Sequence, residues 1–125
     1  MLELHVHMGM FDFGVNVAIG PHEKLLKYAL FKLEVKKDSE DERRLTRFLS
    51  EQKRGCYISH SGFCPIVWIP RFPRTPREYA TLAHEAVHAV YRLAAWANIP
   101  LTDDTEEVVT HATAHIVDAV LSQRR

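Results

Sequence analysis

The chain has 125 residues, with 16 basic and 16 acidic side chains and a formal net charge of zero. This length suits a single domain that spans residues 1–125, and it is enough to bury a hydrophobic core without disulfide bonds. Proteins that bind nucleic acid or anionic membranes usually carry a basic excess, so we expect no nucleic-acid partner and no membrane partner.

The sequence carries no signal for export or membrane insertion. No window approaches the roughly 18 apolar residues of a membrane span, and the N-terminus has no basic stretch followed by an apolar run. The two cysteines, Cys56 and Cys64, are too few for a disulfide framework. They could face each other across a hairpin, although reduced packing residues are the preferred interpretation. We therefore expect a cytoplasmic protein.

The first half of the chain shows two strand patterns followed by two helix patterns. Apolar residues alternate over residues 2–7 and 11–19, which predicts two strands joined near Gly9. Apolar residues then recur at helical spacing over 25–33 and again over 45–49. The many charges of the second helical stretch are typical of a solvated helix face.

A β-hairpin over residues 56–69 and a proline-rich connector lead to the clearest helix start in the sequence. Thr75 suits the N-cap, Pro76 the first helical position, and Glu78 the third, which completes a capping box. Nothing interrupts a helix from there to Ala97, and Asn98 follows as a stop signal.

A final helix is predicted from near Asp103, with Asp103 as cap and Glu106 reaching back, to about Ser122. The resulting fold class is α+β. It has a small N-terminal antiparallel sheet, a β-hairpin, and two long C-terminal helices.

The stretch His84-Glu85-Ala86-Val87-His88 carries the strongest chemical signal in the chain. Histidines four residues apart on a helix lie one above the other, and two such imidazoles can bind one tetrahedral zinc ion. Glu85 lies about 100° around the helix, outside the ligand pair but close to the metal. It is placed to act as general base on a zinc-bound water.

A hydrolytic zinc site needs a third protein ligand, and the last helix offers acidic residues and histidines. Glu106 competes as a helix cap, whereas Glu107, His111, His115 and Asp118 form one polar stripe. Helix lengths and the linker allow Glu107 to reach the zinc. His111, one turn further on, would support the site or substitute as ligand. A solvated helix edge is the alternative interpretation of this stripe.

The segment 84–88, followed by Glu107-Val108-Val109-Thr110-His111, resembles the gluzincin class of zinc metallopeptidases. The likeness covers about residues 64–120, and the order of elements resembles small metallopeptidase-like proteins encoded by phages and prophages. It implies that His84, His88 and Glu107 bind zinc and that Glu85 is the catalytic base. If phage-encoded, the protein would work in the host cytoplasm.

The resemblance also bears on how substrate binds. It implies that the strand around 66–69 could border the cleft and receive an extended peptide, although a core strand with Trp68 buried is as good an interpretation. Tyr91, His111 and His115 are candidates to stabilise the oxyanion of the reaction. The chain lacks the large second lobe that thermolysin-like enzymes use to build substrate pockets.

The sequence therefore predicts a zinc-dependent hydrolase, most simply a peptidase or amidase of restricted specificity that acts on a peptide or protein substrate. Glu85 and His111 are the candidate catalytic residues. The alternative is a non-catalytic accessory or structural protein, for example of a phage, that retains a zinc site of this kind. A regulatory protease with one target protein would share the chemistry of the first hypothesis.

Overall fold

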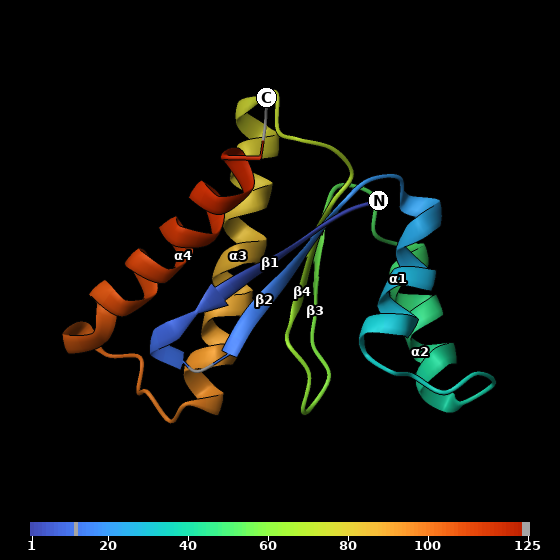
Figure 1. Cartoon of the computed structure of the whole chain (residues 1–125), viewed down its shortest axis with the longest axis horizontal. Helices are drawn as coiled ribbons and strands as arrows, with labels where there is room; N and C mark the ends of the chain where they lie inside the picture. Colours follow the sequence, from blue (N-terminus) through green and yellow to red (C-terminus); the bar gives the residue numbers. More distant parts are fainter. Residues whose placement is uncertain (12, 124–125) are drawn as a thin grey trace.

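The computed structural model describes residues 1–11 and 13–123 and has an α+β fold, as the sequence predicts. Four strands form one sheet, and four helices pack against it (Figure 1). The strands are β1 (Leu2–Met8), β2 (Phe13–Ile19), β3 (Cys56–Ile58) and β4 (Ile66–Ile69). The helices are α1 (Leu25–Lys32), α2 (Glu40–Ser50), α3 (Pro76–Trp96) and α4 (Glu106–Leu121), with short 3-10 turns η1 (Gly9–Phe11), η2 (His22–Lys24) and η3 (Asp103–Thr105).

The sheet is mixed, because the two predicted hairpins join through a parallel pair. Its strand order is β1-β2-β4-β3, with β1 antiparallel to β2, β2 parallel to β4, and β3 antiparallel to β4. Strand β4 therefore has a neighbour on each side, and its Trp68 is fully buried. No peptide can add to β4, so the core-strand interpretation of residues 66–69 is correct. The edge that is free to pair with a peptide belongs to β3, the edge strand next to β4.

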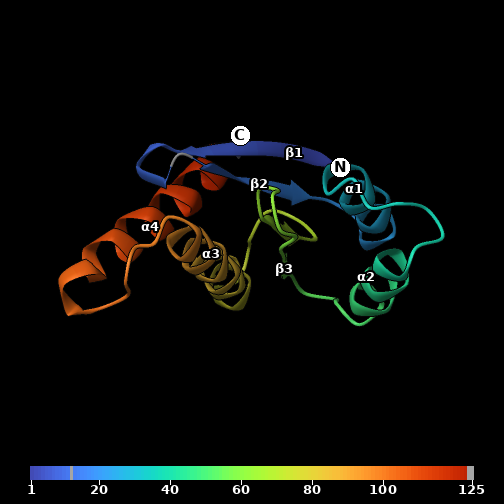
Figure 2. The ribbon, with the colours of Figure 1, turned by 90° about the horizontal axis from the view of Figure 1, so that it is seen from below.

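The two pairs of helices cover opposite faces of the sheet, as Figures 1 and 2 show together. Helices α3 and α4 enclose one apolar cluster with alternate side chains of β1, β2 and β4. Helices α1 and α2 enclose a second cluster around Trp68, whose indole Nε1 donates to the Gly20 carbonyl at 3.0 Å. Alternation along each strand sends successive side chains to the two clusters, which is why β4 is apolar throughout.

The start of α3 follows the prediction. Thr75 accepts a hydrogen bond from the Glu78 backbone N–H, and the Glu78 carboxylate accepts from the Thr75 N–H, which completes the capping box. Arg71 of the preceding connector forms an ion pair with Glu78 at 2.7 Å. These contacts fix where α3 begins and hence the register of every site residue on it.

The start of α4 differs from the prediction of an Asp103 cap with Glu106. Thr102 takes the cap position, its N–H donates to the Thr105 hydroxyl at 2.8 Å, and a 3-10 turn precedes the helix proper. Two good capping residues stand side by side here, and the earlier one is used. Further along α4, Ala112, Ile116 and Val120 are buried and form the face that packs against the core.

The prediction of reduced cysteines is confirmed. Cys56 and Cys64 are both free thiols, and Cys56 is buried. His5 and His7 are exposed on β1. Within residues 1–11 and 13–123, no helix combines the length and the apolar character needed to cross a bilayer.

Candidate metal centre

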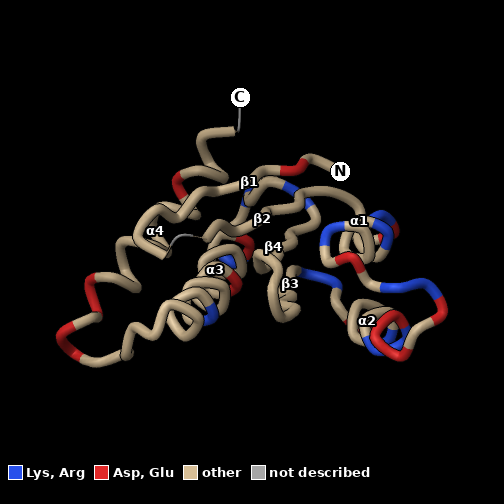
Figure 3. Tube along the Cα trace, turned by 60° about the horizontal axis from the view of Figure 1, so that its bottom comes forward, with Lys and Arg blue, Asp and Glu red and all other residues tan. Residues whose placement is uncertain are grey.

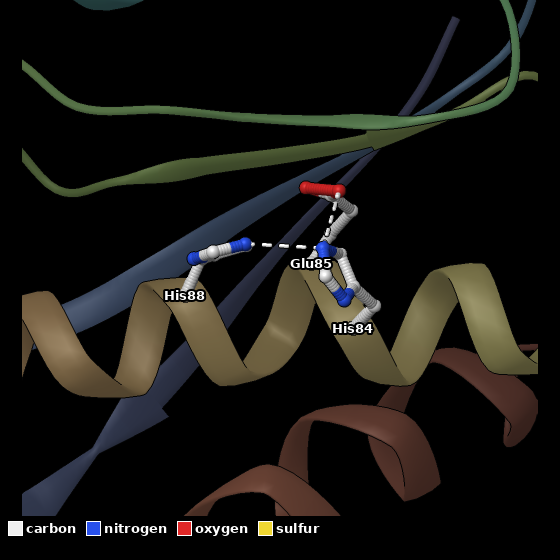
Figure 4. Close-up of side chains that lie close together, drawn as sticks. All are labelled: His84, Glu85 and His88. Carbon is white, nitrogen blue, oxygen red and sulfur yellow. Dashed lines mark hydrogen bonds and ion pairs between the residues drawn. The ribbon is translucent and has the colours of Figure 1, made fainter.

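His84, Glu85 and His88 gather on one side of α3. Their candidate ligand atoms all lie within 4.8 Å of one another, and no other such group of three occurs among the described residues. The two Nε2 atoms are 3.1 Å apart, and His84 Nε2 is 3.9 Å from a Glu85 carboxylate oxygen. Figure 4 shows the two imidazoles directed at each other and the Glu85 carboxylate directed toward the strands.

The spacing of the two imidazoles fits zinc. Two nitrogens that each lie 2.0–2.1 Å from a tetrahedral zinc ion are roughly 3.3 Å apart, close to the 3.1 Å between His84 Nε2 and His88 Nε2. The ring planes are almost perpendicular, at 84°. In the alternative arrangement, one neutral imidazole donates a hydrogen bond to the other. Both histidines project from consecutive turns of a well-capped helix, so helix geometry alone makes the two imidazoles neighbours.

Burial separates Glu85 from its histidine neighbours. The Glu85 side chain is 13% exposed, whereas that of His84 is 68% exposed. Burial raises the pKa of Glu85, although His84 and His88 act in the opposite direction. The neighbouring thiol of Cys56 on β3 has its pKa raised to about 12, mainly by burial and further by the Glu85 carboxylate. A carboxylate with a raised pKa is the more basic one, which suits a general base.

The cluster opens into a groove of about 580 Å³ that follows the free edge of β3 between α2 and α3. Figure 2 shows β3 placed between these two helices. Glu85 and His88 form part of one wall, and the α2 residues Leu45 and Phe48 form part of the opposite wall. His60, at the far end of β3, lines the same groove. The groove therefore brings together an open strand edge, a wall of α2 on which Leu45 and Phe48 lie among charged and polar residues, and the Glu85 and His88 side chains of the cluster.

Sequence reasoning missed two further residues, Tyr57 and Arg92, that border the cluster. The Tyr57 ring stacks on His88, with ring centroids 5.7 Å apart and planes at 22°. Its hydroxyl accepts a hydrogen bond from Arg92 Nε at 3.1 Å, which leaves the hydroxyl proton free to be donated elsewhere. Arg92 follows His88 by one helical turn, so the helix periodicity could have identified it. Tyr57 could not be found in this way, because its position depends on β3 lying beside α3.

The structure does not bring Glu107 into the cluster. Glu107 pairs with His111 at 3.1 Å, and the two side chains are 83% and 78% exposed. At about 100° per residue, Glu107 lies about 180° around α4 from the buried Ile116. It is also the second residue of α4, which follows the end of α3 by a nine-residue connection, whereas His88 lies about 12 Å before that end. The assignment of Glu107 as third zinc ligand therefore stays a prediction of the sequence.

The other predicted residues of α4 and α3 also lie apart from the groove. His115 Nε2 lies 3.3 Å from the His7 carbonyl oxygen of β1, the strand at the opposite edge of the sheet from β3. Tyr91 is exposed and falls about 60° around α3 from His88, on the side away from Glu85. Neither residue, nor His111, is among the described residues that line the groove.

No family model matches the chain, and no curated protein and no solved structure is similar to it. Its function is therefore inferred from its own residues and their geometry.

Proposed function

We propose that this chain is a zinc-dependent hydrolase that cleaves amide bonds in a peptide or protein, with His84 and His88 as zinc ligands and Glu85 as general base. The observation that carries the proposal is the convergence of two Nε2 atoms, 3.1 Å apart, beside a largely buried carboxylate at the wall of a groove. Such a set combines the ligands that zinc prefers with a base whose carboxylate is shielded from water.

Glu85 carries the proton transfers. A bound zinc ion supplies Lewis acidity, which polarises the substrate carbonyl and makes water a better nucleophile. A Glu85 carboxylate oxygen accepts the proton that water loses on attack at the carbonyl carbon. Glu85 then donates this proton to the amine nitrogen as the carbon–nitrogen bond breaks, so the enzyme ends in its starting state.

Tyr57 and Arg92 are the best-placed donors to the oxygen that becomes negative during this attack. They replace Tyr91, His111 and His115 in that role, because they adjoin His88 on the side of α3 that carries Glu85. The Arg92 guanidinium donates to the Tyr57 hydroxyl, which strengthens that hydroxyl as a donor in turn. The ring of Tyr57 also fixes the plane of His88.

The groove supports an extended peptide as substrate. Strand β3 pairs with β4 on one side only, so its other edge presents backbone N–H and C=O groups to the groove. An extended chain can satisfy these groups by adding as a further strand. Its side chains then alternate between the cluster wall and the opposite wall, which includes Leu45 and Phe48.

A second candidate function is a non-catalytic protein that binds a partner through the same groove. One observation favours it: catalytic zinc sites usually have three protein ligands, and within residues 1–11 and 13–123 only two histidines and the Glu85 carboxylate converge. In this case zinc would be structural or weakly held, and loss of the Glu85 charge would have no effect on function.

The Glu85→Gln variant separates the two functions. We expect it to bind zinc with wild-type stoichiometry and to lose at least about a hundredfold in turnover, a loss typical for removal of a general base. Zinc is measured by elemental analysis, and turnover by mass spectrometry on a mixed peptide library. Glu51→Gln removes an exposed carboxylate elsewhere and is the control. Undiminished cleavage by Glu85→Gln would refute the proposed mechanism.

A further inference from the structure

A second hollow, of about 360 Å³, lies where the chain leads into β3 and α3 begins. Four cationic residues line it: Lys53, Arg54, Arg71 and Arg77. In Figure 3 the basic segment that runs from α2 into β3 is visible as a continuous blue stretch. The chain as a whole has no net charge, so this concentration of positive charge is local.

Most of this charge is unbalanced. Arg71 is paired with Glu78, which also accepts from the backbone N–H groups of Arg74 and Thr75. Among the described residues, no carboxylate lies within ion-pair distance of Lys53, Arg54 or Arg77. The capping box already occupies the N-terminus of α3, so the attraction for an anion comes from these three side chains.

Gly55 lets the loop and the helix that line the hollow approach each other closely. Its φ is +154°, and a Cβ atom there would lie 2.7 Å from the Thr81 methyl carbon and 3.2 Å from the Trp68 carbonyl oxygen. Only glycine allows the backbone after Lys53 and Arg54 to pass this close to α3. The cationic side chains of the loop and of the helix are therefore brought to one place by a specific backbone contact.

The hollow lies beyond the end of the groove at which β3 begins, on the far side of the contact between Gly55 and Thr81. Gly55 directly precedes Cys56, the first residue of β3, and Thr81 precedes Glu85 by one helical turn on the same side of α3. Arg77 precedes His84 by seven residues, about 10 Å along the helix. That distance corresponds to about three residues of extended chain. A peptide that lies along β3 with its reactive bond at the cluster is thus long enough to extend to the hollow with about three further residues.

We propose that this hollow binds the carboxylates of an acidic segment of the substrate peptide, about three residues from the bond that is cleaved. This specificity rests on the proposed peptidase function. The hollow is small and lies at the beginning of a strand with an open edge, which matches a single extended polypeptide. A nucleic-acid duplex instead requires a broad basic surface and usually a net basic charge.

Direct binding tests this specificity without relying on catalysis. The full-length Glu85→Gln protein, loaded with zinc, is titrated into fluorescent eight-residue peptides that carry three consecutive glutamates or three glutamines. We expect the acidic peptide to bind about tenfold more tightly at low salt, a preference that added salt reduces. The double charge reversal Lys53→Glu with Arg77→Glu should abolish the preference. The same reversal at Lys24 and Lys27, which are exposed on η2 and α1, is the matched control and should preserve it.

Three outcomes would overturn the proposal: equal affinity for the two peptides, equal loss in both double reversals, or tighter binding of a single-stranded oligonucleotide than of the acidic peptide. Circular dichroism verifies that each variant is folded. Failure of the hydrolase proposal gives a different pattern: the wild-type protein cleaves neither peptide, while the selective binding and its loss in the Lys53 and Arg77 variant persist.

Discussion

Gly55→Ala is the sharpest test of the contact between α3 and the segment that leads into β3. The new methyl would meet the Thr81 methyl carbon at 2.7 Å in a backbone conformation, φ +154°, that alanine rarely adopts. Backbone strain of this kind costs of order 1–3 kcal/mol, and overpacking typically adds about 1–3 kcal/mol. Reduced entropy of the unfolded chain offsets about 0.4–1 kcal/mol. We therefore expect a net loss of about 2–4 kcal/mol in the free energy of unfolding.

The two contributions can be separated, because Thr81→Ser removes the clashing methyl and keeps the hydroxyl that donates to the Arg77 carbonyl. In the double variant the steric part should be recovered, about 1–2 kcal/mol, while the backbone strain remains. Urea unfolding followed by the fluorescence of the buried Trp68 measures all four proteins of this cycle. A Gly55→Ala protein within about 0.5 kcal/mol of wild type would show that the loop does not approach α3 as described.

Three further predictions address the site and its helix. From its position outside the cluster, Glu107→Ala should keep zinc affinity within about twofold of Glu106→Ala; calorimetric titration that finds a loss only in Glu107→Ala would contradict this and support the sequence prediction of Glu107 as a ligand. Tyr57→Phe keeps the ring but loses the hydroxyl, so kcat should fall about tenfold to a hundredfold with zinc retained; an unchanged kcat would exclude the hydroxyl as oxyanion donor. The Arg71 side chain, with the backbone N–H groups of Arg74 and Thr75, lowers the pKa of Glu78 from 4.5 to about 2, so these contacts stabilise the fold above pH 4.5, and their contribution disappears as pH falls toward 2. Arg71→Ala should thus lower Tm at pH 7 and converge with wild type near pH 2.5; a Tm difference that stays constant with pH would contradict this.

The parts of the site that the sequence predicts are those determined within one helix. The positions of His84, Glu85 and His88 follow from helical spacing, and the capping box at Thr75 fixes where that helix starts. The strand patterns near the N-terminus are equally local, since alternation alone identifies the buried face.

What the sequence could not supply depends on contacts between distant segments. The parallel pairing of β2 with β4 leaves no local signal, yet it decides that β3 and not β4 borders the groove. The stacking of Tyr57 on His88 depends on the same pairing. The prediction for Glu107 used helix lengths and a linker, and these quantities do not determine how α4 is rotated about its axis.

The parallel β2–β4 pair also has a consequence for how the chain folds. A β1–β2 hairpin alone is at most marginally stable. Strand β2 pairs further with β4, and α1, α2 and β3 lie between these two strands in the sequence. Closing so long a loop is entropically costly and slow compared with forming a helix or hairpin. During synthesis, β2 therefore remains without its partner until Ile69 has left the ribosome. Substitutions in β4 should then slow folding, whereas those in α4 should mainly accelerate unfolding.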